Sequence, residues 1–361
     1  MTDRNKAHVR LVDIAGRVGL SSMAVSKALR DHPDMATDTV QRVKRVAAEM
    51  GYVPNHFARS LQSRGGSRLL GVVVPKIRHA FFAETLAAIQ EAAAERGYEI
   101  LVGVSQEEPE AERRHIETFL SMRVEGLLVS VSQRPGPDND DYGWIHKQGV
   151  PLLYFDRAPR QRSGFQAVVM DDFGGAREAV LAAVAQGRGC IAHLAGYADT
   201  NIGAQRCAGY EAGLIAAGLP VDPDLIVEGG LGELDGYRGF QRLWAMSKRP
   251  DAIFCASFPI AVGVMDAMRA LAPEDIGEVL LVFFGVRDMA RFFPSPYICV
   301  VQPAAELGRL AVDQILRAID GEVIEAKSPL SIELMTSNTP VRPSYLEEVE
   351  SEHAIKGTLG V

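Results

Sequence analysis

The chain has 361 residues, of which 47% are hydrophobic and 23% charged, with a mean hydropathy of +0.02 and a net charge of −8. This composition indicates a globular protein of two or three domains and excludes a disordered, collagen-like or membrane-spanning chain, because the longest apolar runs, such as residues 279–286, fall far short of a bilayer span. The four cysteines form no Cys-x-x-Cys pair and the histidines are scattered, which argues against a zinc site.

Charge is distributed unevenly along the chain. Residues 1–68 hold 12 Lys and Arg against 6 Asp and Glu, whereas the remaining 293 residues hold 26 against 40. A small basic end on an acidic protein predicts that this end alone contacts nucleic acid, because phosphate repels the rest. Charge alone leaves open a solvated basic helical face. The first ten residues are polar and lack the apolar stretch of a secretory signal, which predicts a cytoplasmic protein.

Three short helices are predicted in the basic end. Apolar residues recur at helical spacing over residues 11–18, and Gly19 ends this helix. A second helix is predicted over residues 22–29, and a third over residues 37–50 with Gly51 as its stop. Two short helices joined by a tight glycine-containing turn indicate a helix-turn-helix, whose second helix enters the major groove of DNA N-terminus first.

Specific motifs accompany this pattern through the first 61 residues. They are Leu11-Val12-Asp13-Ile14-Ala15, Val18-Gly19-Leu20-Ser21, Val25-Ser26-Lys27-Ala28-Leu29, Gly51-Tyr52-Val53-Pro54-Asn55 and Ala58-Arg59-Ser60-Leu61. Together they resemble the lactose-repressor (LacI/GalR) family of transcription regulators, and a weaker likeness continues to about residue 340. A helix-turn-helix pattern by itself is weak evidence, but its combination with the two downstream segments is specific.

The resemblance implies contacts from the second helix to DNA. Ser22 and Met23 match positions that read base edges, where Met23 offers only apolar contact, and Lys27 matches a basic residue that reaches guanine. Lysine is a point charge rather than a fork, so its selectivity is expected to be softer than that of arginine. Ser21 and Ser26 match phosphate-contact positions, although Ser21 could equally be only a helix cap. Ala36 stands where the family usually has a capping serine.

The segment 55–62 resembles the hinge helix of the family, which forms on DNA and docks in the minor groove. A helix this short is marginal alone, so coupling its folding to binding is physically reasonable. The implied DNA-contacting residues are Asn55, Ala58, Arg59 and Leu61. Leu61 matches a leucine that wedges between base pairs and kinks the duplex; the alternative is a core leucine in an ordinary linker.

From residue 69 onward, short apolar runs alternate with helical patterns. A first set of strands is predicted over 69–75, 99–104, 126–131 and 150–156, and a second set over 168–171, 190–196, 225–229 and 252–257. Helices are predicted between them, and residues 279–285, 298–302 and 307–319 are expected to return to complete the subdomains. The rhythm predicts two doubly wound parallel sheets with a ligand cleft between them. The resemblance implies a periplasmic-binding-protein-like body.

The resemblance also implies which residues line that cleft. Aromatic, charged and polar side chains are expected there: Phe81, Phe82, Asp156, Arg206, Ser257, Arg287 and Gln302. Each could instead be a core, surface or interdomain residue. Ser257-Phe258 and Val286-Arg287 stand where the family usually carries acids. Loss of two carboxylates, with Arg157, Arg206 and Arg287 nearby, would favour an anionic ligand such as a sugar acid or sugar phosphate over a neutral sugar; alternatively Arg287 points elsewhere.

The predicted protein is a homodimeric, sequence-specific DNA-binding regulator, most simply a repressor, that binds a palindromic operator and is controlled by a sugar-like effector. The alternative is a sugar-binding module or carrier without regulatory role. No P-loop, dinucleotide turn or nucleophile elbow is present, so no enzyme, cofactor or metal is expected. The predicted domains are residues 1–54 (DNA-binding), 55–68 (hinge), 69–345 (effector-binding and dimerising) and 346–361 (a polar tail).

Overall fold

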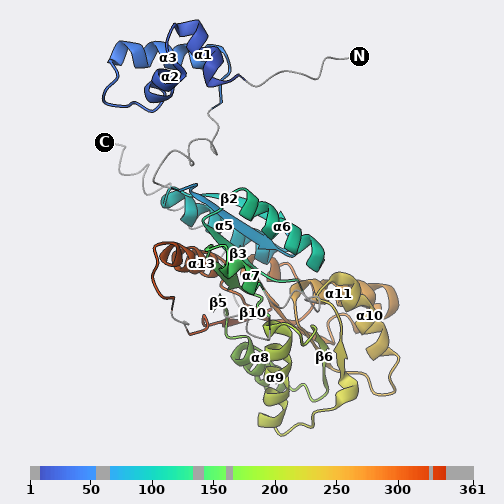
Figure 1. Ribbon diagram of the computed structural model, residues 1–361. Coiled ribbons are helices and arrows are strands. Elements are labelled where there is room, and N and C mark those ends of the chain that lie inside the picture. Colours follow the sequence, from blue (N-terminus) through green and yellow to red (C-terminus); the bar gives the residue numbers. More distant parts are fainter. Residues whose placement is uncertain (1–8, 54–65, 133–141, 160–165, 325–327, 339–361) are drawn as a thin grey trace, which may run out of the picture. The chain divides into compact units, whose positions relative to one another are not determined.

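The computed structural model describes residues 9–53, 66–132, 142–159, 166–324 and 328–338. Contacts divide the chain into two compact units, residues 1–67 and 68–361, here called the head and the body (Figure 1). Most of the predicted hinge, including Asn55, Ala58, Arg59 and Leu61, and the whole predicted tail lie outside the described residues.

The head packs three helices around one small core. They are α1 (Leu11–Val18), α2 (Ser22–Ala28) and α3 (Thr37–Glu49), each within one residue of its predicted bounds. Helix α1 ends at Gly19, whose φ of +71° lies in the left-handed region that glycine adopts without strain. All three helices contribute buried side chains, namely Ile14, Ala15, Val25, Ala28, Val43 and Ala47.

The first subdomain of the body is a five-stranded, fully parallel sheet in the order β2-β1-β3-β4-β5. Its strands are β1 (Leu69–Val74), β2 (Glu99–Val104), β3 (Gly126–Val129), β4 (Leu152–Phe155) and β5 (Gln166–Val168). Alternate residues of β1 face opposite sides, so both faces of the sheet are covered. One face packs against α5 (Ala80–Glu95) and α13 (Ala304–Ile319), the other against α6 (Pro109–Ser121) and α7 (Gly143–His146).

The second subdomain is a six-stranded sheet in the order β11-β10-β9-β8-β6-β7. Its strands are β6 (Ile191–Ala195), β7 (Ile226–Glu228), β8 (Ala252–Cys255), β9 (Leu280–Gly285), β10 (Tyr297–Val301) and β11 (Glu333–Thr336). Helices α8 (Asp172–Ala185) and α9 (Asn201–Ala216) cover one face. Helices α10 (Glu233–Trp244) and α11 (Phe258–Leu271) cover the other face. Three short elements lie in the connections between strands and helices: α12 (Arg287–Ala290) and the 3₁₀ turns η1 (Pro223–Leu225) and η2 (Pro273–Asp275).

Two features of these sheets differ from the sequence prediction. The strand expected over residues 168–171 was placed in the second set, which is wrong: β5 pairs with β4 in the first sheet. Strand β11 was not predicted, and it pairs antiparallel with β10 at the edge of an otherwise parallel sheet. An apolar run indicates a strand but does not identify its neighbour, because pairing partners lie far apart in sequence.

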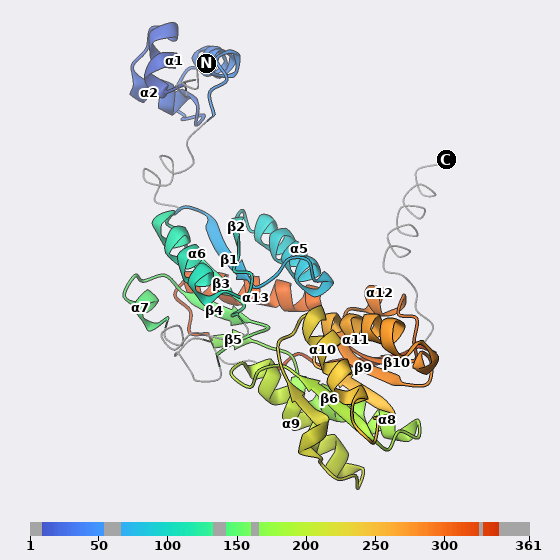
Figure 2. The same ribbon diagram turned by 90° about the vertical axis from the view of Figure 1, so that its right-hand side faces the viewer.

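The chain crosses between the subdomains after β5, after β10 and again after α13. Figures 1 and 2 show α13, coloured orange to red, beside α5 in the first subdomain although the preceding strand belongs to the second. This agrees with the predicted return of residues 307–319. Because parallel strands end at a common edge, the loops that follow β1 and β4 meet those that follow β8, β9 and β10. The connections after the strands of both sheets therefore build the cleft described below.

Candidate functional site

Helix α2 presents the residues predicted to read bases. Ser22 and Met23 are exposed, with 73% of Met23 accessible to solvent, while Val25 and Ala28 are buried. The Ser21 hydroxyl accepts a hydrogen bond of 3.1 Å from the Ala24 amide and caps the helix. Its own proton is left to donate, so the capping role is compatible with a phosphate contact.

Lys27 is held by a neighbouring acid. Its Nζ lies 3.2 Å from Asp34 Oδ2, and Asp34 also lies 3.3 Å from His32 Nδ1. The predicted contact of Lys27 with a base edge would therefore require it to leave Asp34. Ser26 is half-buried on the same helix, and Ala36 gives α3 no side-chain cap. The family usually has a capping serine at position 36, and the methyl side chain of alanine cannot accept the hydrogen bond that such a serine would accept.

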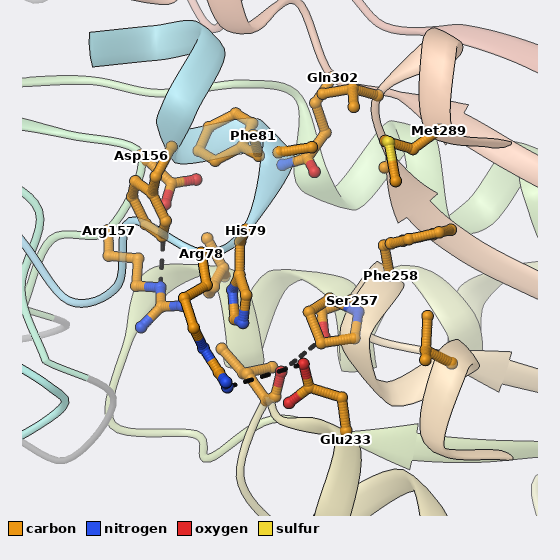
Figure 3. Close-up of a pocket in the computed structure, with 18 of the residues that line it drawn as sticks. Arg78, His79, Phe81, Asp156, Arg157, Glu233, Ser257, Phe258, Met289 and Gln302 are labelled. Atoms are coloured by element: carbon orange, nitrogen blue, oxygen red, sulfur yellow. Dashed lines mark hydrogen bonds and ion pairs between the residues drawn. The ribbon is translucent and has the colours of Figure 1, made fainter. Parts of the chain in front are cut away.

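The body contains a cavity of about 320 Å³ between its two subdomains (Figure 3). Six of the seven predicted effector residues line it: Phe81, Phe82, Asp156, Arg206, Ser257 and Gln302. The sequence did not assign several other lining residues, namely Arg78, His79, Ile202, Leu231, Glu233, Phe258, Val262, Val286 and Met289. The cavity lies at the low end of the usual 300–1,000 Å³ for ligand pockets, which favours a small ligand.

Asp156 sits at the turn after β4 and is almost fully buried. Its φ of +58° is unusual for a residue with a side chain, and its backbone is fixed on both sides, since its amide donates to Val168 O and its carbonyl accepts from Asn201 Nδ2. Burial raises the pKa of Asp156 to about 6, although Arg157 and Arg206 oppose that rise. The fold therefore holds a poorly solvated carboxyl group against the cavity.

Two buried arginines flank Asp156, and each is already paired. Arg157 Nη1 donates to both Glu107 oxygens at 3.0 and 3.1 Å. Arg206 Nε donates to Asp172 Oδ1 at 2.8 Å, and its Nη1 donates to Ala256 O. Arg206 Nη2 also lies 2.7 Å from Asp172 Oδ1, and Arg157 Nε lies 3.8 Å from Asp156 Oδ2. Both guanidinium groups are therefore balanced by buried carboxylates within the body.

The β1–α5 connection supplies Arg78 and His79. Arg78 Nη2 lies 4.0 Å from Glu233 Oε1 at the start of α10, so this exposed ion pair joins the two subdomains beside the cavity (Figure 3). Burial, assisted by Lys76, lowers the pKa of His79 to about 4, so the ring is neutral at physiological pH. His79 lies in the connection directly before α5 and forms part of the cavity wall. His193 is a core residue, fully buried between Tyr210 and Phe254.

The wall from the second subdomain is mainly apolar. Ser257 lines the cavity, but its hydroxyl donates to Leu231 O at 2.9 Å and accepts from the Ile260 amide as the cap of α11. Gln302 is buried at the end of β10, with its Nε2 4.0 Å from Met170 Sδ. Arg287 is not brought to the cavity: its Nη2 donates to Glu333 Oε2 at 2.5 Å on β11.

These pairings alter the electrostatic expectation. Each arginine that lines the cavity faces a carboxylate: Arg78 with Glu233, Arg157 with Glu107 and Arg206 with Asp172. Asp156 adds a further acid. The predicted excess of positive charge is therefore not found among the lining residues, and the charges favour a neutral ligand over an anion. Within the described residues, no group of three or more His, Cys, Asp or Glu could hold a metal ion, and no helix is sufficiently long and apolar to cross a membrane.

Comparison with known proteins gives consistent matches along the chain. Residues 67–335 match the model of periplasmic binding proteins and the sugar-binding domain of the LacI family, and residues 10–55 match the model of bacterial regulatory proteins of the lacI family. The transcriptional repressor CytR of Escherichia coli K12 is 27% identical over 321 residues, covering 88% of this chain and 92% of that protein. The repressor PurR of Klebsiella pneumoniae is 28% identical over 319 residues, with the same coverage.

A solved structure shares the fold over nearly the whole chain. The lac repressor dimer bound to operator and the anti-inducer ONPF superposes with a TM-score of 0.74 at 24% identity, covering 93% of this chain and 100% of that chain. Helical head and α/β body thus occur in the same order in both proteins. The curated relatives are transcriptional repressors and not enzymes, in agreement with the absence of a catalytic motif noted in the sequence.

Proposed function

Because the chain belongs to the LacI family of bacterial regulatory proteins, DNA-binding repressors that respond to small molecules, we propose how its own residues divide that work. Helix α2 reads the operator, and the cavity between the body subdomains binds the effector. A sugar-binding module or carrier without regulatory role would not need the helix-turn-helix that the family model matches over residues 10–55. Acting on DNA places the protein in the cytoplasm.

The DNA-binding part of the proposal rests on the exposed start of α2. Ser22 and Met23 project from a helix that Val25 and Ala28 fix in the head core. Lys27 adds a charge that reaches bases after releasing Asp34. Two heads on a two-fold axis read the two halves of a palindrome, so the operator-binding unit is a homodimer. The segment with Asn55, Arg59 and Leu61 contacts the centre of the site.

The effector part rests on one observation: three buried charged residues from the two subdomains, Asp156, Arg157 and Arg206, line a single cavity between them. A ligand in this cavity contacts residues of both subdomains at once, and so favours one relative orientation of the two. The free energy that couples effector binding to operator binding is typically about 1–3 kcal/mol in such proteins. The coupling is reciprocal, so that operator binding changes the affinity for the effector by the same factor.

Selection from a random duplex library with the full chain tests the regulator function. We expect enrichment of one palindromic sequence, with affinity that falls steeply as salt rises. Fluorescence anisotropy with the selected duplex then measures the effect of sugars, glycosides, nucleosides, sugar acids and sugar phosphates. A library that yields no enriched sequence, or an enriched duplex whose binding none of these ligands alters at millimolar concentration, would contradict the proposal.

A further inference from the structure

A second cavity, of about 280 Å³, lies within the second subdomain of the body. The ends of β6 and β7, the connections that follow them and one face of α10 form its walls, and it is here called the α10 cavity. It shares no lining residue with the cavity between the subdomains: Leu231 and Glu233, which lie between its own Gly230 and Asp235 in sequence, line the other cavity. The α10 cavity is therefore a separate site that the proposed function leaves unused.

Two arginines on α10 line this cavity one helical turn apart. Arg238 and Arg242 are both exposed, and neither forms an ion pair with a carboxylate of the described residues. Four residues advance a helix by about 6 Å, so the two side chains share one face of α10 and their like charges repel each other. A ligand with two separated negative charges would relieve this repulsion, because one charge could lie on each guanidinium group.

The two acids that line the cavity are engaged by main-chain amides. Asp235 Oδ2 accepts a hydrogen bond of 3.1 Å from the Gly232 amide at the start of α10. A methyl group on Gly230 would lie 2.5 Å from the same oxygen, so the glycine allows this carboxylate to fold back on the loop. Glu228 Oε1 accepts a hydrogen bond of 3.4 Å from the Ala198 amide. Among the described lining residues, the two guanidinium groups are therefore the charged groups that are left to bind a ligand.

Apolar side chains complete the lining of the α10 cavity. Leu194 from β6, Val227 from β7 and Ile260 from α11 contribute to its wall. Gly239 brings α10 close to β6, since a methyl group at this position would lie 2.7 Å from Leu194 Cδ2. A hydrocarbon segment of a ligand would leave water on packing against these side chains, which favours binding. The volume lies just below the usual range for ligand pockets, so the ligand must be small.

From these observations we propose that the α10 cavity binds a short aliphatic dicarboxylate with the length of succinate or glutarate. One carboxylate lies on Arg238 and the other on Arg242, because a guanidinium group matches both oxygens of a carboxylate with two parallel N–H donors. The methylene chain between the carboxylates packs against Leu194, Val227 and Ile260. This site is additional to the proposed effector site, and neither proposal depends on the other.

Isothermal titration calorimetry with the full chain tests the proposal. The probes are succinate, glutarate, adipate, butyrate and inorganic phosphate at low ionic strength, since salt screens exposed charges. We expect succinate or glutarate to bind at least about 10-fold more tightly than butyrate, because butyrate lacks one of the two charge-assisted contacts. Phosphate should also bind more weakly than the dicarboxylate, because it has neither two separated charged groups nor a hydrocarbon chain.

Single variants of α10 locate the site. Arg238→Gln and Arg242→Gln should each weaken dicarboxylate binding about 10-fold, and should leave thermal unfolding without ligand unchanged because both side chains are exposed. Arg269→Gln is the matched control, since Arg269 is an exposed arginine of α11 that does not line the cavity. Arg238→Lys keeps the charge but loses the paired donors, and it should give an intermediate loss.

Arg78→Gln distinguishes this site from the proposed effector site, because Arg78 lines the cavity between the subdomains and not the α10 cavity. It should leave dicarboxylate binding unchanged. A loss of binding in Arg78→Gln but not in the two α10 variants would place the ligand in the other cavity and overturn the proposal, while the effector site would stand. Binding of butyrate or phosphate as tight as that of glutarate, equal effects of Arg242→Gln and Arg269→Gln, or no binding of any dicarboxylate would overturn it as well.

Discussion

Replacing Asp156 by asparagine should stabilise the protein while it destroys ligand binding. The carboxyl group is buried, and the raised pKa of about 6 already includes the attraction of Arg157 and Arg206. Its charge therefore opposes folding at neutral pH. Asparagine has nearly the same shape and tolerates the left-handed backbone at φ +58°, so Asp156→Asn removes the charge with little strain.

The magnitude follows from the two pKa values. The unfolded carboxyl has a pKa of 3.8 and the folded one about 6, so the folded state retains a proton that the unfolded state loses between these values. Stability from this group accordingly falls as pH rises from about 4 to 6 and is then constant. The free energy of unfolding of Asp156→Asn is expected to exceed that of the wild type by about 1 kcal/mol at pH 4.5 and by about 3 kcal/mol at pH 7.5.

Urea unfolding of the full chain at a series of pH values measures this difference. Asp266→Asn is the matched control, because Asp266 is exposed on α11 and its removal should change stability by less than about 0.5 kcal/mol. Ligand at 100 times its dissociation constant should stabilise the wild type by about 2.7 kcal/mol and Asp156→Asn hardly at all. An Asp156→Asn protein that is no more stable than the wild type, or whose advantage does not grow between pH 4.5 and 7.5, would refute the reasoning.

Three further predictions concern side chains outside Asp156. Asp34→Asn frees Lys27 from its 3.2 Å partner and should tighten operator binding several-fold in anisotropy titrations at low salt; unchanged affinity would show that the pair does not restrain Lys27. Ser21→Ala removes the α2 cap and should destabilise the head by about 1 kcal/mol in thermal unfolding, and full stability would contradict the capping role. Glu233→Gln leaves Arg78 unbalanced and should strengthen glucose 6-phosphate binding in a salt-sensitive manner, whereas equal binding would place Arg78 too far from the ligand.

The sequence by itself determined the architecture of the head and the class of the body. Apolar periodicity and Gly19 located three helices to within one residue, because helix formation depends on neighbours three and four positions away. Alternation of strands and helices predicted parallel sheets for the same local reason. Motif resemblance placed six of seven predicted effector residues on one cavity, since each lies just after a strand or in the first turns of the helix that follows one, at the edge that faces the cleft.

Only the tertiary structure decided which charges are free. Arg206 is neutralised by Asp172, Arg157 by Glu107 and Arg287 by Glu333, and the members of these pairs are separated by 34, 50 and 46 positions along the chain. From the sequence, all three arginines had been expected to lie near the cleft and to favour an anionic ligand. A side chain's charge is visible in the sequence, but its partner is set by how distant elements pack, and burial then determines whether that charge remains available to a ligand.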